Sequence, residues 1–280
     1  MKIIDYYDKD SFDRLMCDDK NVILMMEDFF KTVPLEYRGE YDKNIDGLIV
    51  LKVDKIKTDD NDYSEDTTGI YQNITNTILF TENDSLVHEF VHMSGFDSEK
   101  YVYPFMDVYA GNAFYEGMIE YLAKIICQKK DITGYFFEEF IAEMLVMIRR
   151  ELVKQAFIYD KKEFFSLFKN KVALYNLLVN LNDFSNSQDG KINSFKDRKM
   201  VREYIKSVIR NFNVLINDEE DKQVVKNCKE AFLDEIKSRE VGDMLFYYDK
   251  KYRSFIYQEF MMTKEEVSQN KGVVRRLIRR

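Results

Sequence analysis

The chain has 280 residues, of which 45% are hydrophobic and 33% are charged. Because 15% of the residues are aromatic, the apolar surface suffices for a sizeable core, and a disordered chain is excluded. The net charge of −8 argues against nucleic acid as the main partner. With only 2 prolines and 10 glycines, helix breakers are scarce, and we expect an α+β protein that is mainly helical.

The first eighty residues predict a small antiparallel or mixed sheet preceded by a helix. Residues 22–30 are mostly apolar and predict a helix that ends near Pro34. Residues 47–53 are apolar and β-branched, which is typical of a strand. Residues 69–80 carry apolar side chains at even spacing and predict a second strand region.

The next helix is expected to begin after Thr81, which with Asp84 three places on resembles a capping box. It should run to about residue 94, with Gly95 as its C-cap. Nearly everything after Gly111 is predicted to be helical: residues 113–129, 136–157 and 162–181, then three or four more helices.

Residues 182–197 are polar and rich in turn formers, and we place the domain boundary there. The predicted organisation is a first domain over residues 1–182, which contains the sheet, and a helical C-terminal domain or extension over residues 197–280.

Residues 88–92 read HEFVH and lie on the helix predicted after Thr81. His88 and His92 are four residues apart, so both imidazoles lie on one helix face and can hold one Zn²⁺. Glu89 is placed to act as the general base that accepts a proton from a coordinated water. Two histidines placed at random would fall four apart in only about 0.7% of cases, which makes a chance match improbable. The alternative is a pair of helix histidines satisfied by neighbouring groups.

A catalytic zinc needs three protein ligands, and with no third histidine the third must be a carboxylate or a thiolate. The best candidate is Glu116, 24 residues after His92 on the next predicted helix. Glu120 lies one turn further on the same face and can accept the free N–H of a ligating imidazole. The alternative is that both acids are solvated on a surface helix.

HEFVH followed by YEGMIEYLAK resembles the gluzincin zinc peptidases, the thermolysin-like group in the broad sense. A close variant with Asn and Thr, where this chain has Tyr115 and Ile119, occurs in bacterial HExxH proteins. The resemblance covers about residues 69–125. It implies a zincin-like core, hydrolysis of peptide or protein substrates, Glu116 as the third zinc ligand, and an edge strand at residues 76–80 that pairs with the substrate.

The resemblance also implies a side chain that stabilises the oxyanion, which in thermolysin is a histidine and a tyrosine. This chain has no spare histidine, so the role falls to a tyrosine or an arginine. Tyr101, Tyr103 and Tyr109 lie between His92 and Glu116, and we favour Tyr103. Each of them can equally be a packing or surface residue.

Three functions remain open at this point. The first is an active zinc peptidase, favoured by Glu89, and the second is a non-catalytic zinc-binding scaffold or regulatory protein, favoured by the missing histidine. The third is an exported effector protease. We expect no classical secretion signal and no transmembrane helix, and the cysteines, Cys17, Cys127 and Cys228, are too widely spaced for a disulfide framework. We therefore expect a cytoplasmic protein, whose oligomeric state the sequence does not determine.

Overall fold

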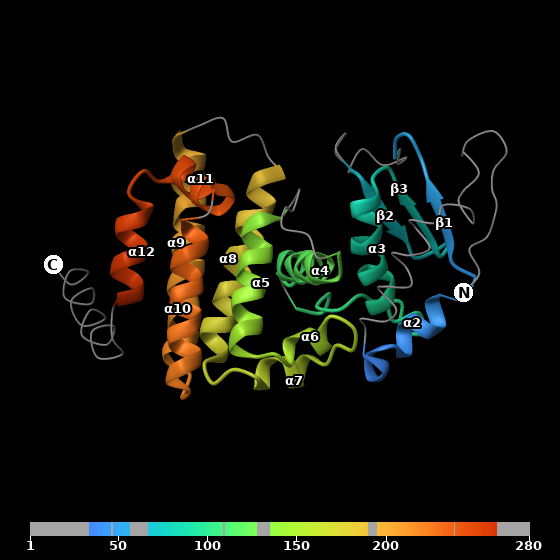
Figure 1. Cartoon of the computed structure of the whole chain (residues 1–280), viewed down its shortest axis with the longest axis horizontal. Coiled ribbons are helices and arrows are strands. Elements are labelled where there is room, and N and C mark those ends of the chain that lie inside the picture. Colours follow the sequence, from blue (N-terminus) through green and yellow to red (C-terminus); the bar gives the residue numbers. More distant parts are fainter. Residues whose placement is uncertain are drawn as a thin grey trace. The chain divides into compact units, whose positions relative to one another are not determined.

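A computed structural model of the chain describes residues 34–45, 47–56, 67–108, 110–127, 135–189, 195–237 and 239–261. It consists mainly of helices with one small three-stranded mixed sheet, which confirms the predicted α+β, mainly helical class (Figure 1). Over these residues, no helix combines the length and the apolar character that a membrane crossing requires. Contacts divide the chain into two compact units, the first made of Met1–Val108, Tyr115–Tyr135 and Glu151–Lys161 and the second of the rest.

The sheet of the first unit is built around β3 (Thr77–Phe80), whose four residues are all buried. β3 pairs in parallel with β1 (Ile49–Lys52) and antiparallel with β2 (Gly69–Gln72), so the strand order is β1-β3-β2. Leu79 packs with Leu51 and Ile56 in one apolar cluster. Because side chains alternate along a strand, Ile78 and Phe80 are directed to the opposite face of the sheet.

The strand region predicted over residues 69–80 contains two strands, β2 and β3, which a turn joins into a hairpin. The turn lies at residues 73–76, where Ile74 is 83% exposed. Asn76 has a φ of 49°, in the left-handed region that asparagine tolerates better than most residues. The Tyr71 hydroxyl donates to Oδ1 of Asn76 over 2.9 Å, which ties the first strand to the turn.

The edge strand expected at residues 76–80 is instead the central strand β3, and this expectation was wrong. Among the described residues, β2 pairs on one side only, with β3. The Thr81 amide donates to the Thr68 carbonyl over 2.8 Å, so residue 68 faces β3. Backbone groups alternate along an antiparallel strand, so those of Gly69 and Tyr71 are directed away from β3.

Helix α3 (Asn83–Gly95) carries the HEFVH segment and packs against β2 and β3. Its N-cap is Glu82, which makes no side-chain capping bond, so the expected capping by Thr81 was wrong. The Thr81 amide and hydroxyl both donate to the Thr68 carbonyl, so this residue extends the sheet ladder instead.

The C-terminal end of α3 also differs from the expected glycine cap. Gly95 is the last helical residue, and the C-cap is Phe96. Glycine is required at position 95 for space: a Cβ there would lie 2.5 Å from the Ala156 carbonyl oxygen and 2.7 Å from Oη of Tyr115. The end of α3 therefore packs directly against these two residues.

Helix α2 (Gly39–Asn44) packs against α3 in the first unit. The 3-10 helix η1 (Leu35–Tyr37) and α2 begin the described chain, and the helix predicted at residues 22–30 lies outside it. The buried Asn44 side chain donates to the carbonyls of Met93 and Phe96 over 2.8 Å and 2.7 Å. These bonds satisfy carbonyls that a helix end leaves without partners, and they join α2 to α3.

Later helices are more interrupted than the sequence suggested. After α4 (Asn112–Cys127), the helix predicted over residues 136–157 is divided into α5 (Phe136–Ile148) and α6 (Leu152–Gln155). Arg149 supports the break by donating from Nη1 to the Ile148 carbonyl over 2.7 Å. The helix predicted over residues 162–181 is divided into α7 (Lys161–Ser166) and α8 (Lys171–Asp189). Asn170 caps the start of α8, because its side chain accepts a hydrogen bond from the Ala173 amide. The sequence analysis did not predict this cap.

The turn-rich interpretation of residues 182–197 was wrong for its first half, because α8 continues to Asp189. Side chains at helical spacing bury one face of α8 up to residue 184: Leu174, Leu177, Leu178, Leu181 and Phe184. This face packs in a bundle with α9 (Phe195–Asn217), which is followed by α10 (Lys222–Ile236), α11 (Arg239–Tyr248) and α12 (Tyr252–Met261). Both α8 and α9 belong to the second unit, so the boundary predicted between 182 and 197 falls inside it.

We predict that Gly95→Ala destabilises the protein while Gly39→Ala does not. A Cβ at position 95 overlaps the Ala156 carbonyl oxygen, and overpacking of this kind costs about 1–3 kcal/mol or more. A Cβ on Gly39, the first residue of α2, meets no atom within 4 Å. Urea unfolding of the two variants and the wild type measures the difference. Equal stability of both variants would contradict the close packing at the end of α3.

Candidate metal centre

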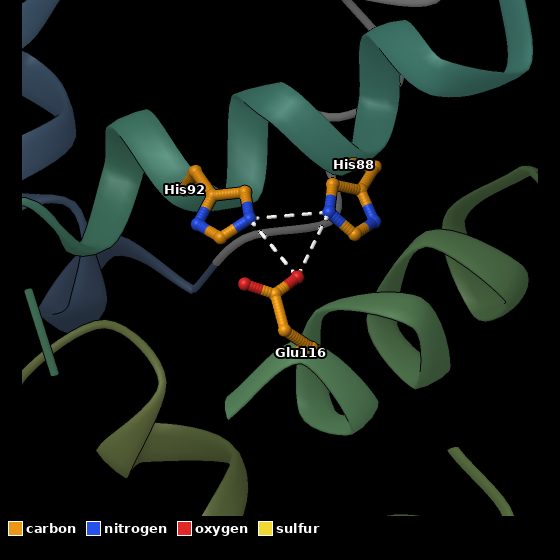
Figure 2. Close-up of side chains that lie close together, drawn as sticks. All are labelled: His88, His92 and Glu116. Atoms are coloured by element: carbon orange, nitrogen blue, oxygen red, sulfur yellow. Dashed lines mark hydrogen bonds and ion pairs between the residues drawn. The ribbon is translucent and has the colours of Figure 1, made fainter. Parts of the chain in front are cut away.

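Three side chains from two helices of the first unit converge on one point. His88 and His92 come from α3 and Glu116 from α4, and Figure 2 shows all three pointing toward one another. The Nε2 atoms of the histidines are 3.1 Å apart. Oε2 of Glu116 lies 3.3 Å from Nε2 of His88 and 3.4 Å from Nε2 of His92.

This triangle has the size that a tetrahedral zinc ion requires. Ligand atoms that each lie about 2.0–2.1 Å from a tetrahedral centre are separated by about 3.3 Å. The three measured separations are 3.1, 3.3 and 3.4 Å. Two imidazole nitrogens and one carboxylate oxygen are also a known ligand set of catalytic zinc. The residues therefore fit the predicted metal, and each offers one ligand atom to it.

Glu120 lies beside the part of His88 that faces away from the triangle. Its Oε1 is 3.1 Å from Nδ1 of His88, where it can accept that N–H. A proton held on Nδ1 leaves Nε2 free to bind a metal and fixes the orientation of the ring. Glu116 and Glu120 act on the same imidazole because they are one helical turn apart on α4.

Without a metal, the cluster is held together by charge. Burial alone would raise the pKa of Glu116, but His92 and His88 outweigh burial and hold this pKa well below its usual range. Burial alone would lower the pKa of His88, but hydrogen bonds to Glu116 and Glu120 raise it well above its usual value. These shifts favour a protonated His88 beside ionised carboxylates when no metal is bound, and a metal cation would replace that proton.

Glu89 lies next to His88 in the chain but is not part of the triangle. Its carboxyl group is buried, with the residue only 6% exposed. Burial raises the pKa of Glu89, while His88 and His92 and a backbone hydrogen bond from Tyr71 act to lower it. A carboxylate with a raised pKa is a stronger proton acceptor than one in water.

Of the three tyrosines considered from the sequence, Tyr103 lies beside the ligands. Its ring packs edge-on against His92, with centroids 6.0 Å apart, and at a tilt against Phe96, with centroids 4.8 Å apart. Tyr101 is exposed, and its hydroxyl donates to Oδ1 of Asn73 over 3.2 Å. Tyr109 lies outside the described residues.

Two other tyrosines flank the ligands and were missed by the sequence reading. Tyr115 packs edge-on against His92 at 5.4 Å, and its buried hydroxyl has no hydrogen-bond partner among the described residues. The ring of Tyr135 lies nearly parallel to that of His88, at 6.4 Å. The only sequence signal for Tyr115 was its position directly before Glu116, and Tyr135 had none.

Comparison of the chain with protein-family models, with curated proteins and with solved structures finds no match. The resemblance to gluzincin peptidases therefore rests on the HEFVH and YEGMIEYLAK segments alone. A fold of this kind does not by itself imply an activity, so the function has to follow from the geometry and chemistry of the site.

We predict that Glu116→Ala weakens zinc binding more than Glu120→Ala. The first change removes a ligand, whereas loss of a group that orients a ligand typically costs about 10–100-fold in affinity. Competition titration with a chelator ranks the two variants, with Glu230→Ala on the exposed surface of α10 as the matched control. The opposite order would mean that Glu120 is the ligand.

We also predict that zinc uptake at pH 7.5 releases more protons from the wild type than from Glu120→Gln. The raised pKa of His88 extends its protonated form to higher pH than is usual for a histidine, whereas zinc binds only the neutral ring. Removal of the Glu120 charge lowers the pKa of His88, so a smaller fraction of the variant carries this proton at pH 7.5. The expected difference is up to about one proton per zinc, measured by calorimetry in buffers of different ionisation enthalpy. Equal release would contradict the charge assignment.

Proposed function

We propose that this chain is a zinc-dependent peptidase that hydrolyses peptide bonds in peptide or protein substrates. One observation carries the proposal. A triangle of two imidazoles and one carboxylate, of the size for tetrahedral zinc, lies beside a buried glutamate that is not one of its members. Structural zinc sites are usually closed by four protein ligands, whereas catalytic sites have three and leave one position open.

Each residue has a distinct part in the proposed reaction. Zinc held by His88, His92 and Glu116 would supply a Lewis acid for the scissile carbonyl and the attacking water. Glu89 would accept the proton of the attacking water and pass it to the leaving amine, and its raised pKa supports this part. Glu120 orients His88. Tyr103, beside His92, is the candidate for stabilising the oxyanion.

The proposed substrate path follows β2 rather than residues 76–80. An extended peptide binds by adding a strand to the free edge of a sheet. Among the described residues, the backbone groups of Gly69 and the carbonyl of Tyr71 are directed to that edge, while the Tyr71 N–H is directed to Glu89. A peptide paired there would have its backbone next to the proposed general base.

The second candidate function is that of a non-catalytic zinc-binding protein. Both histidines of the chain are in the triangle, so neither is left to stabilise the oxyanion, and this observation favours the non-catalytic candidate.

We propose the cytoplasm as the compartment, because widely spaced cysteines suit a reducing environment. Burial raises the pKa of Cys228 to about 11, which keeps it an unreactive thiol.

We predict that Glu89→Gln abolishes turnover and leaves zinc bound. Glutamine keeps the shape of the side chain but cannot accept the proton, and loss of a general base costs about 10²–10⁴-fold in rate. The measurement is cleavage of a proteome-derived peptide library by the zinc-loaded protein, read by mass spectrometry, together with metal content.

Glu82→Gln is the matched control for this experiment, because Glu82 is exposed and makes no capping bond at the start of the same helix. It should cleave as the wild type does, and a chelator should stop cleavage until zinc is restored. Equal cleavage by wild type and Glu89→Gln would remove Glu89 from the mechanism. Zinc binding without cleavage by any variant would favour the non-catalytic alternative.

A further inference from the structure

Gly69, the first residue of β2, faces the proposed general base across a very short distance. A Cβ on Gly69 would lie 2.8 Å from Oε1 of Glu89 and 3.1 Å from its Cγ. It would also lie 2.8 Å from Cβ of Ser85, one turn earlier on α3. The φ of Gly69 is outside the left-handed region, so the backbone does not require glycine here. The lack of space is what requires it.

The backbone of β2 is the second feature that lies close to the Glu89 carboxylate. Gly69 and Tyr71 direct their backbone groups away from β3, as the alternation of the antiparallel ladder dictates. Hydrogen bonding from the Tyr71 backbone acts to lower the pKa of Glu89, so the Tyr71 N–H lies near this carboxylate. The Glu89 carboxylate thus lies against β2. It is next to Gly69, which has no side chain, and near the amide of Tyr71, which is directed away from β3.

We propose that Gly69 is a positioning residue for Glu89: its missing side chain lets the carboxylate lie on the backbone of β2 and so fixes its place relative to His88 and His92. The role of Glu89 as the base rests on the proposed function. A glutamate side chain has several rotamers, and reaction rates depend on holding the reacting group in one geometry. Close packing against the backbone at Gly69, together with one backbone N–H nearby, holds the carboxylate in one place without a further side chain.

Any side chain at position 69 forces a neighbour to move. The end of Glu89 is flexible, whereas Cβ of Ser85 is rigidly attached to α3. Two effects are therefore possible in Gly69→Ala, displacement of the carboxylate and displacement of the helix. Ser85→Gly removes the Cβ that the helix presents, so a double variant isolates the contact with Glu89.

The test compares Gly69→Ala, Ser85→Gly and Gly69→Ala/Ser85→Gly with the wild type, all zinc-loaded and full length. Gly39→Ala is the matched control, because a Cβ there meets no atom within 4 Å. We expect Gly69→Ala and the double variant to lose about 10²-fold in kcat, since a misplacement of about 1 Å can cost that much. Zinc affinity should stay close to the wild-type value, because the three nearest atoms to the new Cβ belong to Glu89 and Ser85 and not to the three ligands.

The Tyr71 amide gives a readout that does not depend on turnover. In protein labelled with ¹⁵N-tyrosine, its signal is the one absent from Tyr71→Phe. We expect the signal to shift in Gly69→Ala and in the double variant, toward its position in Glu89→Ala, since each change removes the carboxylate from the amide. Gly39→Ala and Ser85→Gly should leave it in place.

The proposal is overturned if Gly69→Ala keeps the wild-type kcat, if the Tyr71 signal does not shift, or if Ser85→Gly restores kcat in the double variant. Loss of zinc together with kcat would also overturn it, because the whole helix would then have moved. If the wild type cleaves no peptide, the proposed function fails, and the Tyr71 signal alone decides the placement of Glu89 against β2.

Discussion

The first unit depends on a close approach of α3 and α4 that brings two imidazoles and a carboxylate within 3.4 Å of one another. Gly95 makes this approach possible, since its missing side chain leaves room for Tyr115 and for the Ala156 carbonyl. Asn44 holds the same end of α3 through two backbone carbonyls. Burial of Glu116 would be costly alone, and the positive charge beside it, a proton or a metal ion, offsets that cost.

The residues predicted correctly as neighbours are those related by a single helix. His88 and His92, and likewise Glu116 and Glu120, are four apart, and the helical repeat alone places each pair on one face. The step from α3 to α4 is different, because it depends on tertiary packing that no local spacing determines. The choice of Glu116 came from the need for a third, non-histidine ligand and from the resemblance of HEFVH and YEGMIEYLAK to gluzincins, and the structure brings Glu116 to the histidines.

Contacts between distant segments account for most of what the sequence did not predict. The position of β3 between two strands, the place of Tyr115 against His92, and the need for glycine at position 69 all follow from packing partners far along the chain. The extension of α8 is an exception. Its apolar side chains keep helical spacing to Phe184, so the periodicity was visible and should have outweighed the polar composition after residue 181.

The mainly helical fold says little about activity, but the surroundings of Glu89 are specific. A general base works best with the highest pKa that still leaves it ionised. Burial pushes the pKa of Glu89 upward, and the histidines and the Tyr71 amide oppose this. The position against β2 bears on both effects, because Glu89 is buried there beside Gly69 and the Tyr71 backbone acts to lower its pKa. A zinc-binding scaffold needs no such balance, since a solvated residue at position 89 would leave His88, His92 and Glu116 equally able to hold the metal.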